Sequence, residues 1–284
     1  MNPVLEGKHL TKRFGSGRTE ICAVENVSIS IGPGELVLIM GPSGSGKTTL
    51  VSMLGALLRP TSGSLVIDDV DVTALNESKL PRIRARKIGF VFQAFNLLEA
   101  LTVEENILFP SKLVRDDPHV VKRRANELMD RLSISHRRSA LPRTLSGGEK
   151  QRVAIARSLI NAPPIVLADE PTGNLDSANG QEVLMTLHDV VKDHQRSVVV
   201  VSHDPRVEDV ADRILWLEDG KFRDRREERH GWSRDPVCGM KVDQWAPEFS
   251  VQYREERFLF CSSRCLERFE ENPEAYIAAG RRHE

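Results

Sequence analysis

The sequence predicts an α/β fold built on a mostly parallel sheet, with a much smaller domain towards the C-terminal end. Two observations carry this prediction: short, continuous apolar runs alternate with longer segments of helical periodicity, and the pattern stops at a charged stretch near residue 222. Continuous apolar runs are typical of parallel strands that are buried on both faces. A chain of 284 residues with 40% hydrophobic content is long enough for one sizeable core and a second, small one.

Four apolar runs have the length and composition of central strands. They are Leu36 to Met40, Ile88 to Phe92, Ile165 to Ala168 and Val198 to Val201. Between them, apolar residues recur at helical spacing in two segments, which predicts two amphipathic helices. The first contains Val121, Ala125, Leu128 and Leu132, and the second contains Val183, Leu184, Leu187, Val190 and Val191.

A domain boundary is expected after Asp219 and Gly220, where a charged segment without periodicity begins. We therefore expect a first domain at residues 1–222, with a helical subdomain at about 94–160. A charged linker would follow at 223–233, and a small α+β domain at 234–280.

Charge and hydropathy disfavour several classes of protein. The 40 basic and 41 acidic residues give a formal net charge of −1, so no overall field attracts the chain to nucleic acid. No apolar run approaches the roughly 20 residues of a membrane-spanning helix, and the N-terminal segment does not resemble a signal peptide. We expect a soluble, cytoplasmic chain whose four cysteines stay reduced and serve thiol or metal chemistry.

The segment GPSGSGKT, from Gly41 to Thr48, follows the first central strand and precedes a helix-compatible stretch. Glycines allow backbone N–H groups to surround phosphates, while Lys47 can reach the β- and γ-phosphates and Thr48 can coordinate Mg²⁺. The alternative is a glycine-rich turn with a chance lysine. The expected nucleotide contacts in this loop are Gly41, Pro42, Ser43, Gly44, Ser45, Gly46, Lys47, Thr48 and Thr49.

The third central strand ends in two carboxylates, Asp169 and Glu170, within the segment IVLADE. A carboxylate at this position suits Mg²⁺ binding by Asp169, whereas Glu170 can orient and polarise an attacking water. The alternative is a solvated strand end with two surface acids.

The segment LSGGEKQR, from Leu145 to Arg152, resembles the signature motif of ABC ATPases. Further motifs of that family follow the same order along the chain: Gln93 at the Q-loop position, NLD ending at Asp176, and His203 in SHD. The resemblance covers residues 1 to about 222 and implies an ATPase in which Gln93 senses Mg²⁺ and water and His203 contacts the γ-phosphate.

The same resemblance implies a head-to-tail homodimer or heterodimer that holds two ATP molecules at its interface. Ser146, Gly147 and Gly148 precede a helix-like run and would present anion-binding donors to the nucleotide of the other subunit. Asp176 would link the two sites. Phe14 occupies the family position of a ring that stacks on adenine, with core packing as its alternative.

Two strings, ADEPTGNLD at Ala168 to Asp176 and FNLLEALTVEENI at Phe95 to Ile107, resemble the lipoprotein-release, macrolide-export and cell-division branch. That branch implies a separate integral membrane permease, which would hold this chain on the inner face of the cell membrane. The alternatives are a non-transport ABC ATPase acting on nucleic acid or ribosomes, a metal-binding module with a degenerate ATPase, and a general lipid, peptide or lipoprotein exporter ATPase whose tail only docks.

The C-terminal segment resembles a YHS (TRASH-like) domain. The resemblance rests on DPVCGM at Asp235 to Met240, FLFCSSRCLERF at Phe258 to Phe269 and ENPEAYI at Glu271 to Ile277. Its cysteines are Cys238, Cys261 and Cys265. If Ser262 or Ser263 caps a helix, Cys261 lies just before that helix and Cys265 on its first turn, so both thiolates can face one ion.

Three thiolates form a soft site that suits Cu(I) or Zn²⁺ better than Mg²⁺ or Ca²⁺. A closed zinc site requires four ligands, and the fourth could come from Met240, His230, water or a partner. The alternative is that the three cysteines pack as small apolar residues in a minute core. Cys22, between apolar neighbours, is expected to be core. A tail that binds a soft metal makes heavy-metal-linked export the specific hypothesis.

Overall fold

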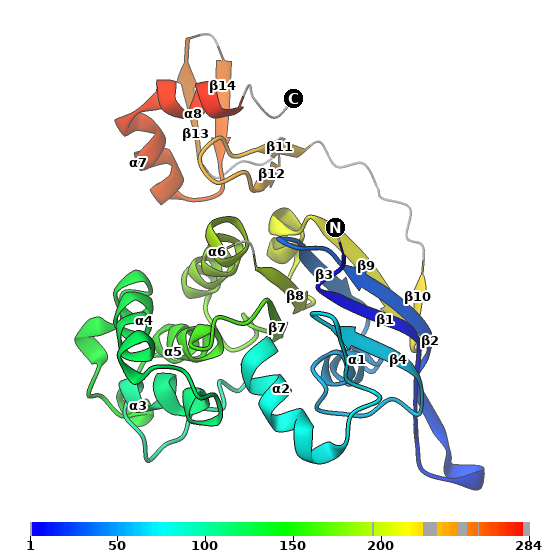
Figure 1. Ribbon diagram of the computed structural model, residues 1–284. Coiled ribbons are helices and arrows are strands. Elements are labelled where there is room, and N and C mark those ends of the chain that lie inside the picture. The colour runs from blue at the N-terminus through cyan, green and yellow to red at the C-terminus, as the bar shows by residue number, and fades with distance from the viewer. Residues whose placement is uncertain (1, 195, 224–231, 244–248, 255, 281–284) are drawn as a thin grey trace. The chain divides into compact units, whose positions relative to one another are not determined.

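The four apolar runs form adjacent parallel strands of one sheet, as predicted. The computed structural model describes residues 2–194, 196–223, 232–243, 249–254 and 256–280 (Figure 1). The sheet has the order β10-β9-β3-β8-β7-β6, and β10 pairs antiparallel with β9 whereas the other pairs are parallel. Its strands are β3 (Leu36–Met40), β6 (Ile88–Phe92), β7 (Ile165–Asp169), β8 (Ser197–Val201), β9 (Arg213–Glu218) and β10 (Lys221–Arg223).

A second, antiparallel sheet has the order β2-β1-β4-β5 and was not predicted from the sequence. Its strands are β1 (Leu5–Phe14), β2 (Ile21–Ile31), β4 (Ser62–Ile67) and β5 (Val70–Asp71). Helix α1 (Lys47–Leu54) shares one buried core with both sheets, because Leu50, Met53 and Leu54 are fully buried in the same apolar cluster as strand residues of each. This packing fixes the loop that precedes α1.

The remaining helices of this part are α2 (Leu80–Lys87), α3 (Val103–Leu108), α4 (Pro118–Arg131), α5 (Gly147–Leu159) and α6 (Ser177–His194). The two predicted amphipathic helices correspond to α4 and α6. Helices α3 and α5 both begin at a capping box, in which the cap hydroxyl and a carboxylate three residues later satisfy otherwise free backbone N–H groups. For α5 the pair is Ser146 and Glu149, so the start of this helix is fixed by local sequence.

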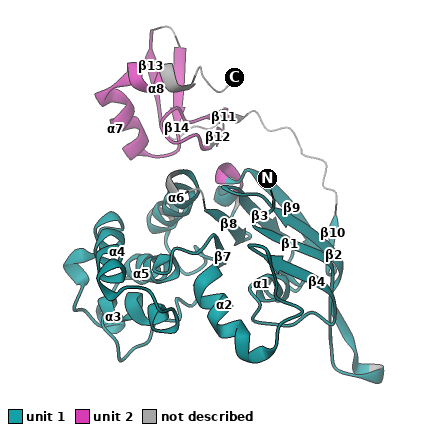
Figure 2. Ribbon diagram, viewed as in Figure 1, with its two compact units in different colours: residues 1–207, 211–224 teal, residues 208–210, 225–284 magenta. Residues whose placement is uncertain are grey.

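The chain divides into two compact units (Figure 2). Unit 1 contains residues 1–207 and 211–224, and unit 2 contains residues 208–210 and 225–284. Most of the linker expected at 223–233 lies outside the described residues, as does His230. Within the described part of the chain, no helix is both long and apolar enough to cross a membrane.

The described residues of unit 2 from 232 onward form two short hairpins and two helices. These are β11 (Trp232–Arg234), β12 (Lys241–Asp243), β13 (Phe249–Tyr253), β14 (Glu256–Phe260), α7 (Ser263–Glu271) and α8 (Pro273–Gly280). Phe269 on α7 is fully buried, and its ring contacts those of Phe258, Phe260 and Tyr253 at centroid distances of 4.9, 5.1 and 6.0 Å. This aromatic cluster fixes α7 against the β13–β14 hairpin.

Candidate functional site

The glycine-rich loop Gly41–Thr48 connects β3 to α1, and its shape requires glycine. Gly41 has φ +150°, and a Cβ atom there would lie 1.9 Å from the carbonyl oxygen of Leu217. Gly46, the N-cap of α1, has φ +99°, and a Cβ atom there would lie 2.2 Å from the carbonyl oxygen of Ala23. Neither conformation nor space tolerates a side chain. The loop therefore presents backbone N–H groups at the start of α1, as an anion cradle requires.

Two polar side chains of this loop are placed where they can bind a phosphate. Lys47 Nζ donates hydrogen bonds of 2.8 Å to the carbonyl oxygens of Gly41 and Pro42, so its ammonium group lies over the loop. Ser45 Oγ is buried without a hydrogen-bond partner. Buried polar atoms are nearly always satisfied in proteins, so this orphaned hydroxyl indicates a site for a polar ligand.

The end of β7 brings Asp169 beside the same loop. Asp169 Oδ1 is buried without a hydrogen-bond partner. Burial raises the pKa of this carboxyl, while a hydrogen bond with Thr48 opposes the rise and the charge of Glu170 adds to it. An orphaned carboxylate oxygen next to a hydroxyl forms the oxygen-rich donor set that Mg²⁺ prefers, so the residues present fit that ion.

Glu170 is held in a strained backbone conformation. Its φ of +49° lies in the left-handed region, and its N–H donates a 2.8 Å hydrogen bond to the carbonyl oxygen of Val201 on the neighbouring strand β8. Its Oε1 lies 2.9 Å from His203 Nδ1, and its Oε2 accepts a 3.2 Å hydrogen bond from Ser202. Parallel strands β7 and β8 thus bring the predicted carboxylate and histidine together at one edge of the sheet.

Gln93, just after β6, contacts the segment that follows Glu170. Its carbonyl oxygen accepts a 2.8 Å hydrogen bond from Asn174 Nδ2, and a Cβ atom at Gly173 would lie 2.9 Å from Gln93 Nε2. Asp176 accepts hydrogen bonds from the backbone and side-chain amides of Asn179, at 2.9 and 2.7 Å, and so orders the start of α6. The Q-loop and D-loop positions are therefore adjacent.

The signature segment begins α5, with Ser146 as its N-cap. Ser146 Oγ accepts from the N–H of Glu149, whose carboxylate in turn accepts from the Ser146 N–H at 2.7 Å. A Cβ atom at Gly148 would lie 2.2 Å from Asn179 Oδ1 on α6, so this glycine permits close packing. Among the described residues, no hydrogen bond joins Ser146, Gly147 or Gly148 to the phosphate loop.

Phe14 ends β1 with its ring 43% exposed, and Lys12 Nζ lies 5.3 Å from the ring centroid. The ring is therefore not part of the core, and core packing does not explain this residue.

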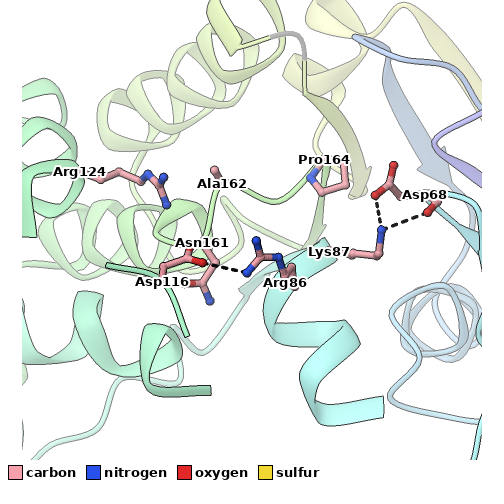
Figure 3. Close-up of a pocket in the computed structure, with 8 residues that line it drawn as sticks. All are labelled: Asp68, Arg86, Lys87, Asp116, Arg124, Asn161, Ala162 and Pro164. Atoms are coloured by element: carbon pink, nitrogen blue, oxygen red, sulfur yellow. Dashed lines mark hydrogen bonds and ion pairs between the residues drawn. The ribbon is translucent and has the colours of Figure 1, made fainter. Parts of the chain in front are cut away.

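A hollow of unit 1 lies at the end of the strands opposite the phosphate loop (Figure 3). It is a cavity of about 340 Å³ lined by Asp68, Arg86, Lys87, Asp116, Arg124, Asn161, Ala162 and Pro164. Lys87 and Pro164 directly precede β6 and β7, whereas Asp169 ends β7. Two ion pairs line it, Arg86 with Asp116 at 2.9 Å and Lys87 with Asp68, while Arg124 donates to the carbonyl oxygen of Ile160 at 2.7 Å. This cavity is distinct from the phosphate loop.

Unit 2 gathers its three cysteines at one point. Cys238 lies in the turn between β11 and β12, Cys261 follows β14, and Cys265 is in the first turn of α7. The Sγ atoms of Cys238 and Cys261 are 3.5 Å apart, and those of Cys261 and Cys265 are 3.7 Å apart. Ser262 caps α7 by accepting from the Cys265 N–H, as predicted. Hydrogen bonds from Cys238 and Cys261 lower the pKa of the Cys265 thiol.

Sequence reasoning missed a fourth member of this cluster, Asp235. One carboxylate oxygen of Asp235 and the three sulfur atoms all lie within 4.8 Å of one another. The only signal in the sequence is that Asp235 stands three residues before Cys238, the spacing of a turn in which a carboxylate accepts backbone N–H groups. Cys22 lies in β2 of unit 1, where its thiol contacts the carbonyl oxygen of Val24.

A phosphate loop, a strand-end carboxylate pair and a capped signature helix define a nucleotide-binding cassette of the phosphate-loop class. Residues 24–173 match the family model described as ABC transporter, and residues 233–279 match that of the YHS domain. The chain belongs to the ABC transporter family and carries a YHS domain.

Three relatives show how far the likeness extends. An uncharacterized ABC transporter ATP-binding protein of Methanocaldococcus jannaschii is 41% identical over 79% of this chain and 97% of its own length. Another, of Mycobacterium tuberculosis, is 41% identical over 74% of this chain and 63% of its own length, so the chain matches under two thirds of that relative. The macrolide export ATP-binding/permease protein MacB of Shigella flexneri is 40% identical over 78% of this chain and 34% of its own length.

A solved structure supports the same family and fold. The dimeric structure of the ATP-binding cassette MJ0796 in a post-hydrolysis state, bound to ADP and Pi, superposes with a TM-score of 0.72 at 40% identity. The match covers 79% of this chain and 99% of that one. The α/β cassette fold predicted from the sequence is confirmed.

Proposed function

We propose that this chain is the ATP-hydrolysing subunit of an ABC transporter of the macrolide-export or lipoprotein-release type, with a metal-binding C-terminal module. The observation that carries the ATPase proposal is the contact between Glu170 Oε1 and His203 Nδ1 at 2.9 Å, beside a phosphate loop and an orphaned Asp169 oxygen. A base, its positioning group and an anion cradle meet at one edge of the sheet.

The side chains have separate roles in hydrolysis. Lys47 turns from the loop carbonyls to the β- and γ-phosphates, while Thr48, Asp169 and Gln93 supply oxygen ligands for Mg²⁺. When bound, Mg²⁺ neutralises charge that develops on the phosphates. Glu170 orients a water and accepts its proton. The water oxygen bonds to the γ-phosphorus, the bond to the bridging oxygen breaks, and ADP and inorganic phosphate leave.

His203 holds the Glu170 carboxylate on one side and offers its other ring nitrogen towards the γ-phosphate. Because Glu170 also accepts from Ser202, the carboxylate has little freedom to rotate away from the attacking water. Pre-organisation of this kind reduces the reorganisation that catalysis needs.

The active form is proposed to be a head-to-tail dimer with two ATP molecules at the interface. Its support is the capped start of α5, where Ser146, Gly147 and Gly148 offer donors at a helix N-terminus, together with the dimeric structure of the related cassette. Phe14, with an exposed ring, is proposed to stack on adenine. Asp176 orders the D-loop that would link the two sites.

The membrane partner is proposed to be a separate integral permease, which would hold this chain at the cytoplasmic face of the membrane. The support is the likeness to the macrolide export ATP-binding/permease protein MacB, whose name joins an ATP-binding part to a permease. A non-transport ABC ATPase, active on nucleic acid, is the competing proposal. The formal net charge of −1 favours the permease over nucleic acid.

The YHS module is proposed to bind a soft metal through Cys238, Cys261 and Cys265. Four ligands around an ion with metal–sulfur bonds of about 2.3 Å place neighbouring sulfurs about 3.8 Å apart. The sulfur separations of 3.5 and 3.7 Å fit that edge. The module would link ATP-driven export to a heavy metal; a general exporter whose tail only docks is the alternative.

The ATPase proposal is tested by Glu170→Gln in the purified full-length protein. Loss of the base should lower phosphate release by roughly 10²- to 10⁴-fold while ATP still binds. Glu127→Gln, at an exposed position of α4, is the matched control and should hydrolyse ATP normally. Normal turnover by Glu170→Gln would overturn the assignment.

The metal proposal is tested by metal analysis under reducing conditions. The wild type should bind one equivalent of Zn²⁺ or Cu(I), and the Cys261→Ser, Cys265→Ser variant should bind none. Cys22→Ser removes a thiol outside the cluster and should bind like the wild type. A wild type that binds no metal would reduce the module to a packing or docking unit.

A further inference from the structure

Asp235 is the most deeply buried acidic side chain of unit 2 among the described residues, at 1% exposure. It lies between β11 and Cys238, with one carboxylate oxygen inside the cluster of cysteine sulfurs. A buried carboxylate is costly unless hydrogen bonds or an opposite charge compensate it. Its surroundings therefore indicate what it does.

The hydrogen bonds of Asp235 come from both cysteine-bearing segments. Oδ1 accepts from the backbone N–H groups of Val237 and Cys238 at 2.8 and 3.3 Å, and Oδ2 accepts from the N–H of Cys261 at 2.9 Å. One carboxylate thus joins two cysteines that are 23 residues apart in sequence. Roughly four lone-pair positions are available on a carboxylate, and these bonds use three of them. One oxygen of this carboxylate also lies within 4.8 Å of all three cysteine sulfurs.

We propose that Asp235 is the fourth ligand of the metal site and that the resulting three-sulfur, one-oxygen set selects Zn²⁺ over Cu(I). This inference rests on the proposed metal binding by the cysteines. Zn²⁺ accepts cysteine sulfur together with carboxylate oxygen in four-coordinate sites. A carboxylate is a hard donor, whereas Cu(I) is a soft ion that prefers thiolates and thioethers. A carboxylate ligand therefore adds little to the affinity for Cu(I).

Charge points the same way. Three thiolates and a carboxylate carry four formal negative charges around one small volume. A divalent ion neutralises half of them, whereas Cu(I) neutralises a quarter. Uncompensated charge in a buried cluster is expensive, so the divalent ion is favoured more strongly than it would be at three cysteines alone.

The same hydrogen bonds also position the cysteine ligands. The Asp235 bonds fix the Cys238 turn and the end of β14, while the Ser262 cap fixes Cys265 on the first turn of α7. Positioning of ligands by hydrogen-bonded neighbours is worth about 10- to 100-fold in metal affinity. In this site the Asp235 carboxylate would both bind the ion and position the cysteine ligands.

The test is a competition titration of the full-length, reduced protein with Zn²⁺ and with Cu(I), each against a chelator of known affinity. We expect the wild type, with Asp235 in addition to the three cysteines, to bind Zn²⁺ more tightly than Asp235→Asn. The variant should lose about 10- to 100-fold in Zn²⁺ affinity. Cu(I) affinity should change much less. Glu267→Gln, exposed on α7 two residues after Cys265, is the matched control.

X-ray absorption of the zinc-loaded wild type provides a measurement that needs no variant. Three sulfurs and one oxygen as nearest neighbours would support the proposal. Four sulfurs, with Met240 as the fourth, would overturn it, as would equal losses of Zn²⁺ and Cu(I) affinity in Asp235→Asn. A wild type that binds neither ion overturns the metal site itself. Binding that prefers Cu(I) and is unaffected by Asp235→Asn overturns both the Asp235 ligand and the zinc assignment, but leaves the cysteine metal site standing.

Discussion

Glu170 Oε1 and His203 Nδ1 are 2.9 Å apart, although the two residues follow different strands, β7 and β8, and are 33 positions apart in sequence. The Glu170 side chain is 15% exposed and that of His203 is 74% exposed. The carboxylate is therefore anchored, while the imidazole reaches from it into open space. This arrangement lets one ring join an incoming phosphate to the base.

Replacement of His203 should remove the connection between the γ-phosphate and Glu170. His203→Ala removes the group that positions Glu170 and a polar contact to the γ-phosphate, so we expect kcat for phosphate release to fall by roughly 10²- to 10³-fold. ATP binding, measured by equilibrium titration, should change little because the loop residues are untouched. His119→Ala, at an exposed histidine of α4, is the control. A His203→Ala protein with wild-type kcat would show that the ring does not act in hydrolysis.

Arg157 on α5 stabilises the segment after Gln93. Its guanidinium donates to the carbonyl oxygens of Phe95, at 2.7 Å, and Asn96, two residues with φ of +61° and +50°. Arg157→Ala should lower the free energy of unfolding by about 3 kcal/mol, since hydrogen bonds from charged groups contribute most. Urea unfolding measures the loss, and faster hydrogen exchange at residues 93–98 locates it. Arg143→Ala, at an exposed position, should leave both unchanged.

The parallel sheet and the strand-end groups could be predicted because their signals are local. The run that forms β7 is apolar to its last residues and then presents Asp169 and Glu170, so period and chemistry agree. Parallel neighbours end at the same edge of a sheet, which is why Glu170 and His203 meet. The cap of α7 was predicted at Ser262 or Ser263 for the same reason, and Ser262 takes this position.

The antiparallel sheet and Asp235 could not be predicted, for physical reasons. Pairing of β1 with β2 shifts register between Gly7 and Leu10, and again at Lys12, so the strand lacks the strict alternation that identifies a half-buried strand. Asp235 bonds locally to Val237, which is an ordinary turn contact. Its role in the cluster depends on Cys261, which tertiary folding brings to it.

Acid should weaken the start of the signature helix. Burial alone would raise the pKa of Glu149, but hydrogen bonds from the Ser146 backbone and from Arg137 outweigh it and lower the pKa to about 2. A carboxylate with a depressed pKa stabilises the fold above its ordinary pKa of 4.5, and that stabilisation is lost as the pH falls from about 4.5 towards 2. Glu149→Gln should therefore be less stable than the wild type at pH 7.

The difference in free energy of unfolding between the two proteins should shrink as the pH falls below 4.5. Urea unfolding at pH 7, 4.5 and 3.5 measures it. Glu127 pairs with Arg123 only at the exposed surface, at 3.7 Å, so Glu127→Gln should show no such dependence. A constant difference between Glu149→Gln and the wild type would mean that the charge of Glu149 does not stabilise the helix.

Metal removal should affect one unit only. Unit 2 has a small core around Phe269, Phe260 and Met240, and a small core gains much of its stability from a bound ion. A free ion at a concentration of a hundred times its Kd raises the free energy of unfolding by about 2.7 kcal/mol. Calorimetry of the full-length protein should therefore show a transition for unit 2 that falls in temperature with a chelator, while the transition of the ATPase unit stays in place. Addition of Mg²⁺ and ATP should raise the transition temperature of the ATPase unit and leave that of unit 2 unchanged. If the chelator shifts both transitions equally, or neither, the ion does not stabilise unit 2 as a separate folding unit, and Asp235 and the cysteines are held by packing alone.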